Sequence, residues 1–430
     1  MKTTLHLGQI LEFDDDPFRA GPNAVRHTRR GAVLVDGARI AAVGDAEGMR
    51  AAHPQAVLCD HGDHLILPGF VDAHAHYPQT GIIASWGKRL IDWLNTYTFP
   101  EEMRFGDPDY ATQVAEIYLD LCLANGITTA SVYCTIHPES VDALMTAAQA
   151  RGMAVTAGKV MMDRNAPPGL RDTAQSAYDD SAALIARWHG RDRLRYAVTP
   201  RFAPTSTPAQ LEAAAALWAA HPDCLLQTHL SEQREEIAWV ADLFPQAGDY
   251  LDVYQSAGLT GPGSVMGHAI HLTDREWAAL ADTGTAIAHC PTSNTFIGSG
   301  LFDITRAQRS CIPTGLATDV GGGSSFSMLR TMAAAYEIGQ LSGAALHPAH
   351  LLWLATAGSA QALCLPDHGR LAPGAWADLV VLDLAATPVT AQRSARAHNI
   401  WEALFPTIML GDDRAVAAVY VAGTTALARS

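Results

Sequence analysis

The sequence predicts an α/β protein: a (β/α)8 TIM-type barrel with a small discontinuous β-sandwich domain formed by both termini. Three observations predict this fold. Short apolar runs alternate with helical patterns along the middle of the chain, strand-like segments occupy both ends, and the composition supplies a sizeable core. Of the 430 residues, 48% are hydrophobic and 17% are charged, a balance typical of globular proteins. At about 150 residues per domain, the length allows one large barrel and a small additional domain.

Eight short apolar runs are the strands of the predicted barrel. Helical patterns lie between several of them, at 108–125, 137–152 and 207–221, and the last begins with Thr207-Pro208, a common helix start. Parallel strands that alternate with helices over about 300 residues indicate a TIM-type barrel, which we place at 67–369 as the catalytic domain. The eight runs are 70–77, 126–133, 154–162, 195–200, 225–231, 264–272, 285–291 and 314–320.

The two ends of the chain have a different pattern. Apolar residues at 31–44 surround Asp36-Gly37, a turn signal typical of a hairpin. Segments 373–384 and 415–428 are also strand-like and contain glycine. We therefore expect residues 1–66 and 370–430 to form the small β-sandwich domain together.

The charge balance and the cysteines exclude several classes of protein. With 29 basic and 44 acidic residues the net charge is −15, which repels phosphate backbones and argues against nucleic-acid partners. No apolar run reaches the roughly 18 residues of a membrane span. The opening residues lack the pattern of a secretory signal, so we expect a cytoplasmic protein. The seven cysteines include no Cys-x-x-Cys pair and do not indicate a disulfide framework.

Polar side chains gather at the carboxyl ends of the predicted strands, where barrel enzymes carry their chemistry. His74 and His76 are two residues apart on the first strand and share a face. His229 ends the fifth strand, and Asp319 ends the eighth before three glycines. Three imidazoles and one carboxylate are a suitable ligand set for one Zn²⁺ or Fe²⁺ with a position left for water. We predict His74, His76, His229 and Asp319 as metal ligands.

Several segments, in this order, resemble the amidohydrolase superfamily, and others resemble its guanine deaminase family more narrowly. The likeness runs through nearly the whole chain. The superfamily segments are PGFVDAHAHYPQ (68–79), THLSE (228–232), GHAIHL (267–272), HCPTSN (289–294) and LATDVGGG (316–323). The narrower segments are HYPQ, TYTFPEE (96–102), GKVMMDRNAP (158–167), TPRFAPTS (199–206) and LGDDR (410–414).

The resemblance implies a cytoplasmic homodimer with one zinc ion per chain, which hydrolyses free guanine to xanthine and ammonia. The chemistry of this reaction suggests catalytic roles for Glu232, His268 and Asp319, with Asp319 holding and deprotonating the attacking water. Zinc would supply hydroxide for attack on C2, with Glu232 carrying a proton to ring N3 and His268 stabilising the tetrahedral centre. The implied substrate contacts are His76, Tyr77, Pro78, Gln79, Arg201, Phe202, His229, Leu230, Ser231, Glu232 and Asp319.

The residue types suit recognition of a purine. Arginine reads the O6 and N7 edge of guanine with two donors, which suits Arg201, and the amide of Gln79 both donates and accepts. Phe202 and Trp86 are candidates for packing on the ring. Three other residues with metal-binding chemistry are predicted to lie outside this ligand group. His61 and His64 precede the first barrel strand and are expected to be solvent-exposed, and Lys159 falls on the third strand, outside a mononuclear site.

Alternatives remain open at this point. The same barrel could act on another ring, such as 8-oxoguanine, cytosine or an aminotriazine, or it could be a scaffold without activity. A different zinc deaminase fold combines His-x-Glu with Pro-Cys-x-x-Cys. The chain contains His137-Pro138-Glu139 but no Pro-Cys pair, which removes that fold.

Overall fold

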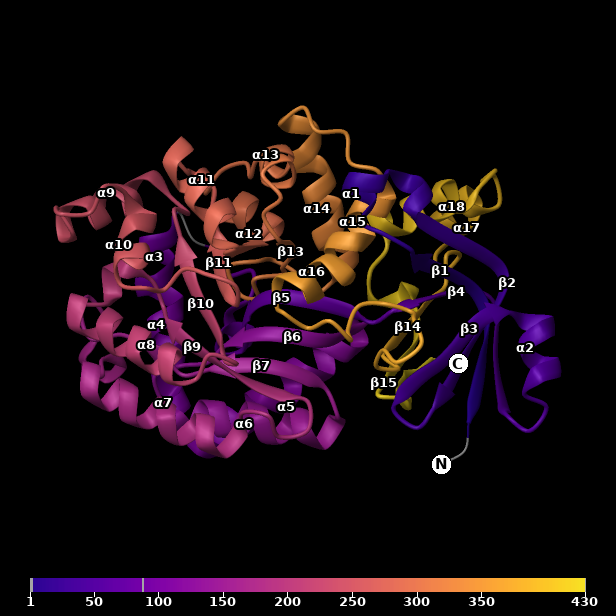
Figure 1. Cartoon of the computed structure of the whole chain (residues 1–430), viewed down its shortest axis with the longest axis horizontal. Helices are drawn as coiled ribbons and strands as arrows, with labels where there is room; N and C mark the ends of the chain where they lie inside the picture. Colours follow the sequence, from indigo (N-terminus) through magenta and orange to yellow (C-terminus); the bar gives the residue numbers. More distant parts are fainter. Residues whose placement is uncertain (1–2, 87–88, 430) are drawn as a thin grey trace.

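The computed structural model describes residues 3–86 and 89–429, which form a barrel and a separate sheet (Figure 1). Eight parallel strands form the barrel, in the order β13-β12-β11-β10-β9-β7-β6-β5, and the short β8 pairs with β9. After β13, the amide of Asp319 donates to the carbonyl of His74 at 2.9 Å, so the two edges meet and nearly close the barrel. The strands are β5 Phe70–His76, β6 Ile127–Tyr133, β7 Ala154–Gly158, β8 Val160–Met161, β9 Leu194–Pro200, β10 Leu225–Leu230, β11 Ser264–His268, β12 Ala286–His289 and β13 Thr314–Leu316.

These strands confirm the eight predicted runs, but the run at 154–162 is divided into β7 and β8, and the last three runs are clearly shorter than predicted. The runs at 264–272 and 314–320 continue beyond the ends of β11 and β13. His268 and Ala269 have φ of 66° and 50°, and Asp319 has φ of 49°. Left-handed backbone cannot continue a strand, so neither run can remain a strand to its predicted end.

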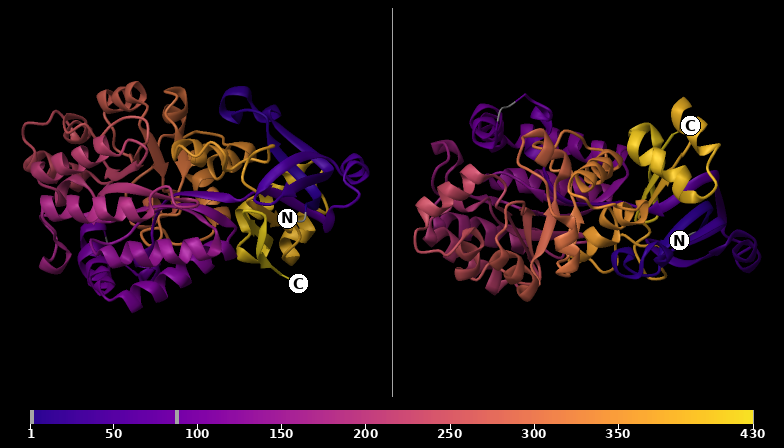
Figure 2. Two further views of the ribbon diagram at one scale, coloured as in Figure 1. Left: turned by 60° about the horizontal axis from the view of Figure 1, so that its bottom comes forward. Right: turned by 90° about the horizontal axis from the view of Figure 1, so that it is seen from above.

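Helices cover the outside of the barrel (Figure 2), and the three predicted ones are confirmed. The Thr207 hydroxyl accepts from the Gln210 amide and caps α8, while Gly152 at φ 65° ends α6. The helices are α1 Pro17–Ala20, α2 Ala46–Ala52, α3 Leu90–Trp93, α4 Phe99–Glu102, α5 Pro108–Ala124, α6 Pro138–Arg151, α7 Ala174–Trp188, α8 Pro208–Ala220, α9 Arg234–Leu243, α10 Tyr250–Ser256, α11 Asp274–Thr283, α12 Pro291–Phe296, α13 Ile304–Arg309, α14 Met328–Leu341, α15 Pro348–Leu354, α16 Ala357–Ala362, α17 Pro388–Ser394 and α18 Ile400–Leu410.

The two ends of the chain form a seven-stranded sheet in the order β16-β15-β14-β4-β1-β2-β3, which we call the terminal sheet. Its hydrogen bonds join all seven strands into one sheet. The predicted hairpin is the antiparallel pair β2–β3. Strand β4 runs almost directly into barrel strand β5, which fixes the sheet to the barrel. The strands are β1 Thr4–Phe13, β2 Val25–Asp36, β3 Arg39–Asp45, β4 Val57–Pro68, β14 Leu379–Leu382, β15 Val416–Val421 and β16 Thr424–Ala428.

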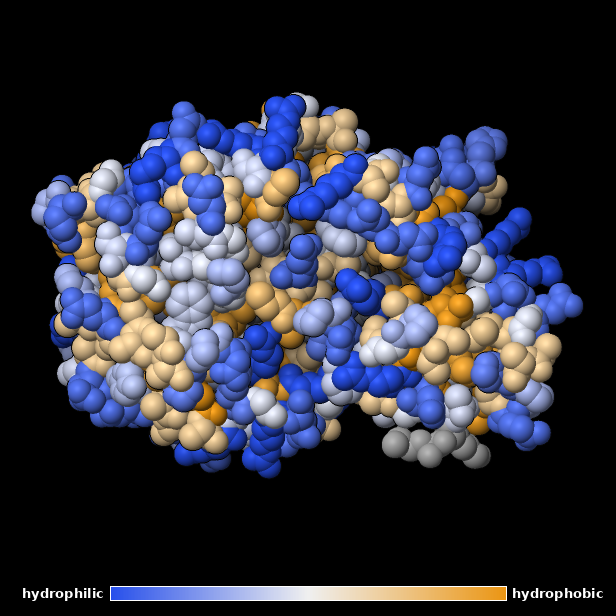
Figure 3. Space-filling model, viewed as in Figure 1, coloured by the Kyte–Doolittle hydropathy of each residue, from blue (hydrophilic) through white to orange (hydrophobic). Residues whose placement is uncertain are grey.

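The predicted fold class, a barrel with a separate β region from both termini, is therefore confirmed. One large apolar cluster fills the space between the barrel strands and their helices, and a second lies on one face of the terminal sheet. Polar and apolar residues are interspersed over the visible surface (Figure 3). Within residues 3–86 and 89–429, no helix is both long and apolar enough to cross a membrane.

Candidate active site

Two imidazoles from β5 and a third from β10 meet at the mouth of the barrel. His76 Nε2 lies 3.2 Å from His74 Nε2 and 3.2 Å from His229 Nε2. Asp319 Oδ1 lies 3.3 Å from His74 Nε2 and 3.5 Å from His76 Nε2. The four residues predicted as metal ligands are therefore neighbours, and the three histidines form a group able to hold an ion.

The protonation of these imidazoles suits a cation. Burial lowers the pKa of His74, and burial with neighbouring histidines lowers the pKa values of His76 and His229 well below the usual range. His229 Nδ1 lies 2.7 Å from the carbonyl oxygen of Arg201. A carbonyl only accepts, so Nδ1 carries the proton and Nε2 keeps its lone pair. Imidazole lone pairs that converge beside a carboxylate fit a zinc or iron(II) ion.

Asp319 is held in place by a turn that needs glycine. Its φ of 49° lies in the left-handed region. A Cβ on Gly323 would lie 1.8 Å from the carbonyl oxygen of Thr318, and one on Gly322 would lie 2.9 Å from Ser293 Oγ, so larger residues do not fit. Burial opposes ionisation of Asp319, but the hydrogen bond with His74 and the positive charge of His268 outweigh it and lower the pKa of Asp319 to about 2. The carboxylate is therefore ionised at neutral pH.

Glu232 and His268 lie beside the ligand group. His268 Nε2 is 3.5 Å from Glu232 Oε2 and 3.7 Å from Asp319 Oδ2. Burial opposes the imidazolium, but the Glu232 carboxylate raises the pKa of His268 well above its usual value. Burial raises the pKa of Glu232 to about 7, and Ser299 Oγ donates to Glu232 Oε1 at 2.8 Å. Glu232 is thus able to take up and release a proton near neutral pH.

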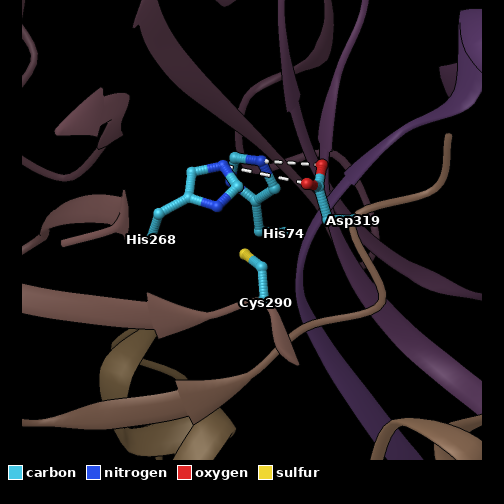
Figure 4. A group of neighbouring side chains, drawn as sticks. All are labelled: His74, His268, Cys290 and Asp319. Carbon is cyan, nitrogen blue, oxygen red and sulfur yellow. Dashed lines mark ion pairs between the residues drawn. The ribbon is translucent and has the colours of Figure 1, made fainter. Parts of the chain in front are cut away.

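Cys290 lies close to His74, His268 and Asp319, and sequence reasoning did not single it out (Figure 4). Dashed lines in Figure 4 join Asp319 to both imidazoles. Cys290 Sγ donates to the carbonyl of Ala288 at 3.4 Å, and burial raises the pKa of the thiol to about 11. Metals bind thiolate rather than thiol, so the three-histidine group with Asp319 is the better metal site.

A cavity opens over these residues, and concave pockets that combine apolar and polar side chains are where proteins bind small molecules. Arg201 and Gln79 line it and are 3% and 2% exposed. Arg201 Nη1 donates to Glu102 Oε2 at 2.7 Å, and Gln79 Nε2 donates to Glu102 Oε1 at 3.0 Å. One buried carboxylate therefore orients both side chains. The lining is His76, Gln79, Leu90, Trp93, Leu94, Arg201, Phe202, His229, Glu232, His268, Ser293, Ile297, Asp319 and Gly322.

Five of the expected contacts lie outside this lining. Tyr77 follows His76 and Leu230 follows His229 along the chain, and successive strand residues face opposite sides. Both therefore pack in the hydrophobic core. Pro78 and Ser231 are buried beside the cavity, whereas Trp86 is 78% exposed. This placement does not support a direct substrate contact for any of the five, which are Tyr77, Pro78, Trp86, Leu230 and Ser231.

Trp93 and Glu102 belong to the site, although sequence reasoning singled out neither. Trp93, in α3, lines the cavity, and its Nε1 is buried without a hydrogen-bond partner in the described part of the chain. Glu102, in α4, is fully buried. The only signal was the segment TYTFPEE, which ends in Glu102.

Three residues with metal-binding chemistry lie outside the ligand group. Lys159, predicted on the third barrel strand, lies between β7 and β8, within that predicted run, and pairs with Asp172 at 2.6 Å. His61 and His64 lie in the terminal sheet, away from the barrel mouth as expected. Both are half-buried, however, because neighbouring strands of the terminal sheet cover part of each side chain.

A model of the amidohydrolase family matches residues 65–426, and a model of a bacterial imidazolonepropionase-like composite domain matches residues 31–56. The guanine deaminase of Escherichia coli strain K12 is 44% identical over 403 residues, which cover 93% of this chain and 92% of the relative. A probable guanine deaminase of Deinococcus radiodurans is 40% identical over 435 residues, which cover 99% of both chains.

A solved structure of E. coli guanine deaminase has a TM-score of 0.97 to this chain at 42% identity. The aligned region covers 99% of this chain and 100% of the solved chain. The likeness therefore extends over the barrel and the terminal sheet alike. On the family match and these full-length relatives, the chain belongs to the amidohydrolase family.

Proposed function

We propose that the protein hydrolyses free guanine to xanthine and ammonia with one zinc ion per chain. The observation that carries this proposal is the buried His74, His76, His229 and Asp319 group, which lies beside Glu232 in one cavity. The similarity to guanine deaminases over nearly the full chain gives the same reaction. It is a hydrolysis of a carbon–nitrogen bond in a cyclic amidine.

The four ligands would hold the metal, and the choice of ion follows from their chemistry. Neutral imidazoles and one carboxylate suit Zn²⁺, and Fe²⁺ accepts the same set. A bound zinc ion lowers the pKa of water to about 7 and so supplies the nucleophile at neutral pH.

Three side chains would manage the protons. Asp319, ionised through its pairing with His74, accepts the proton of the attacking water. Glu232, with a pKa of about 7, protonates ring N3 as C2 becomes tetrahedral, then takes up the proton of the new C2 hydroxyl and passes it to the departing amine. The proton that Asp319 took from the water then restores Glu232 for the next turnover. His268, protonated through its pairing with Glu232, stabilises the negative charge that develops at the tetrahedral centre.

Arg201, Gln79 and Phe202 would select the base. Arg201 presents donors to O6 and N7. The Gln79 amide cannot rotate freely, because Glu102 accepts from its nitrogen, so its second N–H is available to the substrate. Phe202 lines the cavity with an apolar ring that suits the purine face.

The test follows loss of guanine and release of ammonia by the purified, metal-loaded protein, with 8-oxoguanine, cytosine and adenine alongside. Turnover of guanine alone supports the proposal. Preferential turnover of another base would contradict it and identify that base as the substrate. Glu232→Gln should keep about one metal per chain and lose deamination. A wild-type protein that binds no metal and gains no activity from added zinc would favour a scaffold.

Arg201→Leu tests base recognition separately. The variant removes a buried donor pair and leaves Glu102 without its cation, so kcat/KM for guanine should fall on the order of 10²-fold or more. Metal content should stay unchanged, since Arg201 is not a ligand and the backbone carbonyl that accepts from His229 remains in the variant. Retained guanine turnover would overturn this model of recognition.

Other features extend the proposal to the whole protein. The charge of −15 supports the absence of nucleic-acid partners. A homodimer and a cytoplasmic location remain predictions from the sequence, as does the division into a catalytic domain at 67–369 and a small domain at 1–66 and 370–430. Light scattering on the purified protein tests the dimer.

A further inference from the structure

We propose that the terminal sheet carries a second metal site, formed by His6, Cys59 and His61, for a thiophilic cation such as Zn²⁺. His6 lies on β1, and Cys59 and His61 lie on β4. These strands belong to the part of the molecule that Figure 1 shows beside the barrel, not at its mouth. The site is therefore separate from the candidate active site.

The pairing of the two strands brings the three side chains together. Strands β1 and β4 are parallel, and His6 is the register partner of Cys59. Cys59 and His61 are two residues apart on one strand, so they share a face. His61 Nε2 lies 3.3 Å from His6 Nδ1 and 3.6 Å from Cys59 Sγ, and all three ligand atoms lie within 4.8 Å of one another.

The two separations from His61 Nε2 match those between the ligands of a tetrahedral ion. With zinc–nitrogen and zinc–sulfur bonds of about 2.0 and 2.3 Å, two nitrogens lie about 3.3 Å apart and a nitrogen and a sulfur about 3.5 Å apart. The candidate active site provides an internal comparison, because His76 Nε2 lies 3.2 Å from each of its two imidazole neighbours. The distances from His61 Nε2 are thus similar to those from His76 Nε2 at the barrel mouth, with a thiol in place of one imidazole.

The two histidines have the protonation state that ligands need. Burial, with the nearby His61, lowers the pKa of His6 to about 4, and burial with His64 lowers the pKa of His61. Both are neutral at pH 7. His6 is only 1% exposed, and its Nε2 has no hydrogen-bond partner among the described residues. A neutral imidazole that binds a metal through Nδ1 carries its proton on Nε2, so His6 can present the Nδ1 lone pair toward the other two ligand atoms.

Tyr420, on β15, completes the surroundings of the thiol. Its hydroxyl lies 3.2 Å from Cys59 Sγ, within reach to donate a hydrogen bond to the thiolate, and its ring packs edge-on against His6 with centroids 4.4 Å apart. Donors to a ligating sulfur orient it and tune the metal. Cys59 and His61 are both partly exposed, so an ion can enter from solvent.

The ligand types select the class of ion. One thiolate and two imidazoles favour zinc or another soft, late transition-metal ion. Mg²⁺ and Ca²⁺ require oxygen ligands, so neither should bind here. This set of two nitrogens and one sulfur also differs from the proposed catalytic set of three nitrogens and one oxygen.

Metal stoichiometry with matched serine variants tests the site. Zinc-loaded wild-type protein, passed over a desalting column, should retain about two ions per chain, and Cys59→Ser should retain about one. Cys311→Ser replaces an exposed cysteine outside any such group and should retain about two. One ion in the wild type, or equal stoichiometry in the wild type and Cys59→Ser, would overturn the proposal.

Protection of the thiol gives a second measurement that needs no variant. Zn²⁺ should slow alkylation of Cys59 by iodoacetamide on the order of 10-fold or more, because the bound sulfur is no longer a free nucleophile. Cys311 in the same sample should react at an unchanged rate, and Mg²⁺ should protect neither. Equal alkylation of Cys59 with and without Zn²⁺ would overturn the site even if Cys59→Ser failed to fold.

Deamination separates this site from the proposed function. Cys59→Ser should deaminate guanine at the wild-type rate, since the terminal sheet contributes no residue to the cavity lining. Loss of the second ion with activity retained supports a distinct site. Loss of activity together with both ions would assign Cys59 to the stability of the whole protein and overturn a separate site.

Discussion

Trp93 brings a polar atom to an otherwise apolar wall of the cavity. Its side chain is 2% exposed, and its indole N–H has no partner in residues 3–86 and 89–429. Buried donors are seldom left unpaired in folded proteins. A bound purine offers ring nitrogens and a carbonyl oxygen as acceptors, so the ligand itself is the natural partner of this N–H.

Trp93→Phe should therefore raise KM for guanine about 10-fold with little change in kcat, because one hydrogen bond to the bound substrate is lost while the apolar wall remains. Steady-state kinetics on the metal-loaded variant measure this. Trp86→Phe is the matched control, because Trp86 is 78% exposed, and it should behave as wild type. An unchanged KM in Trp93→Phe would contradict the assignment.

Residues differ in how far the sequence alone could place them. His74, His76, His229 and Asp319 end barrel strands, and the carboxyl ends of parallel strands meet at one face, so strand positions alone predicted that they meet. Glu102 lies in α4, in a long connection after β5 whose path no periodicity specifies. Its contacts with the other cavity residues depend on tertiary packing, which the sequence pattern does not report.

At the scale of a strand, Gly267 shows how the barrel makes room for its ligands. It lies on β11 as the register partner of His229 on β10. A Cβ at this position would lie 2.9 Å from Cε1 and 3.2 Å from Nδ1 of His74. Since the neighbouring backbone is held by parallel strand pairing, the imidazole would have to move.

Gly267→Ala should fold but lower zinc affinity about 10- to 100-fold, as changes around metal ligands do. Competition with a chelator measures the affinity, and kcat should recover with excess zinc. Gly248→Ala is the control, because its Cβ would meet only the Asp252 carboxylate at 3.6 Å. Wild-type zinc affinity in Gly267→Ala would show that His74 has space to adjust.

The elements were predicted to different accuracy for physical reasons. The helices at 108–125, 137–152 and 207–221 carry start and stop signals within their own residues, and the structure confirms them within one or two residues. The runs predicted at 264–272 and 314–320 cannot remain strands to their ends, because His268 and Asp319 adopt left-handed backbone. Such strained positions gather at functional sites, and apolar periodicity does not reveal them.

At the scale of the whole molecule, buried charges join the barrel to the terminal sheet. Arg193, just before β9, donates to Asp378, just before β14, and the two side chains are 5% and 4% exposed. Arg193 also stacks over Trp376 at 4.4 Å from the ring centroid. His368 lies at this junction with both ring nitrogens buried and without partners in the described chain. Protonation of His368 at low pH should therefore destabilise the junction between the barrel and the terminal sheet.

His368 gives the stability of the molecule a defined pH dependence. Burial, with the charge of Arg193, lowers the pKa of His368 to about 4, whereas an unfolded histidine titrates near 6.5. Below about pH 6.5 the unfolded chain binds a proton that the folded chain does not, so the free energy of unfolding falls as pH falls and the loss continues to about pH 4. Between pH 7 and 5 this one group should lower the free energy of unfolding by about 2 kcal/mol.

Urea unfolding of metal-loaded protein at pH 7 and pH 5 tests this. The fall in the free energy of unfolding between the two pH values should be smaller in His368→Gln than in the wild type, by about that amount. The surface variant His398→Gln should show the same fall in the free energy of unfolding as the wild type. An equal fall in the wild type and His368→Gln would show that His368 is protonated in the folded protein without loss of stability.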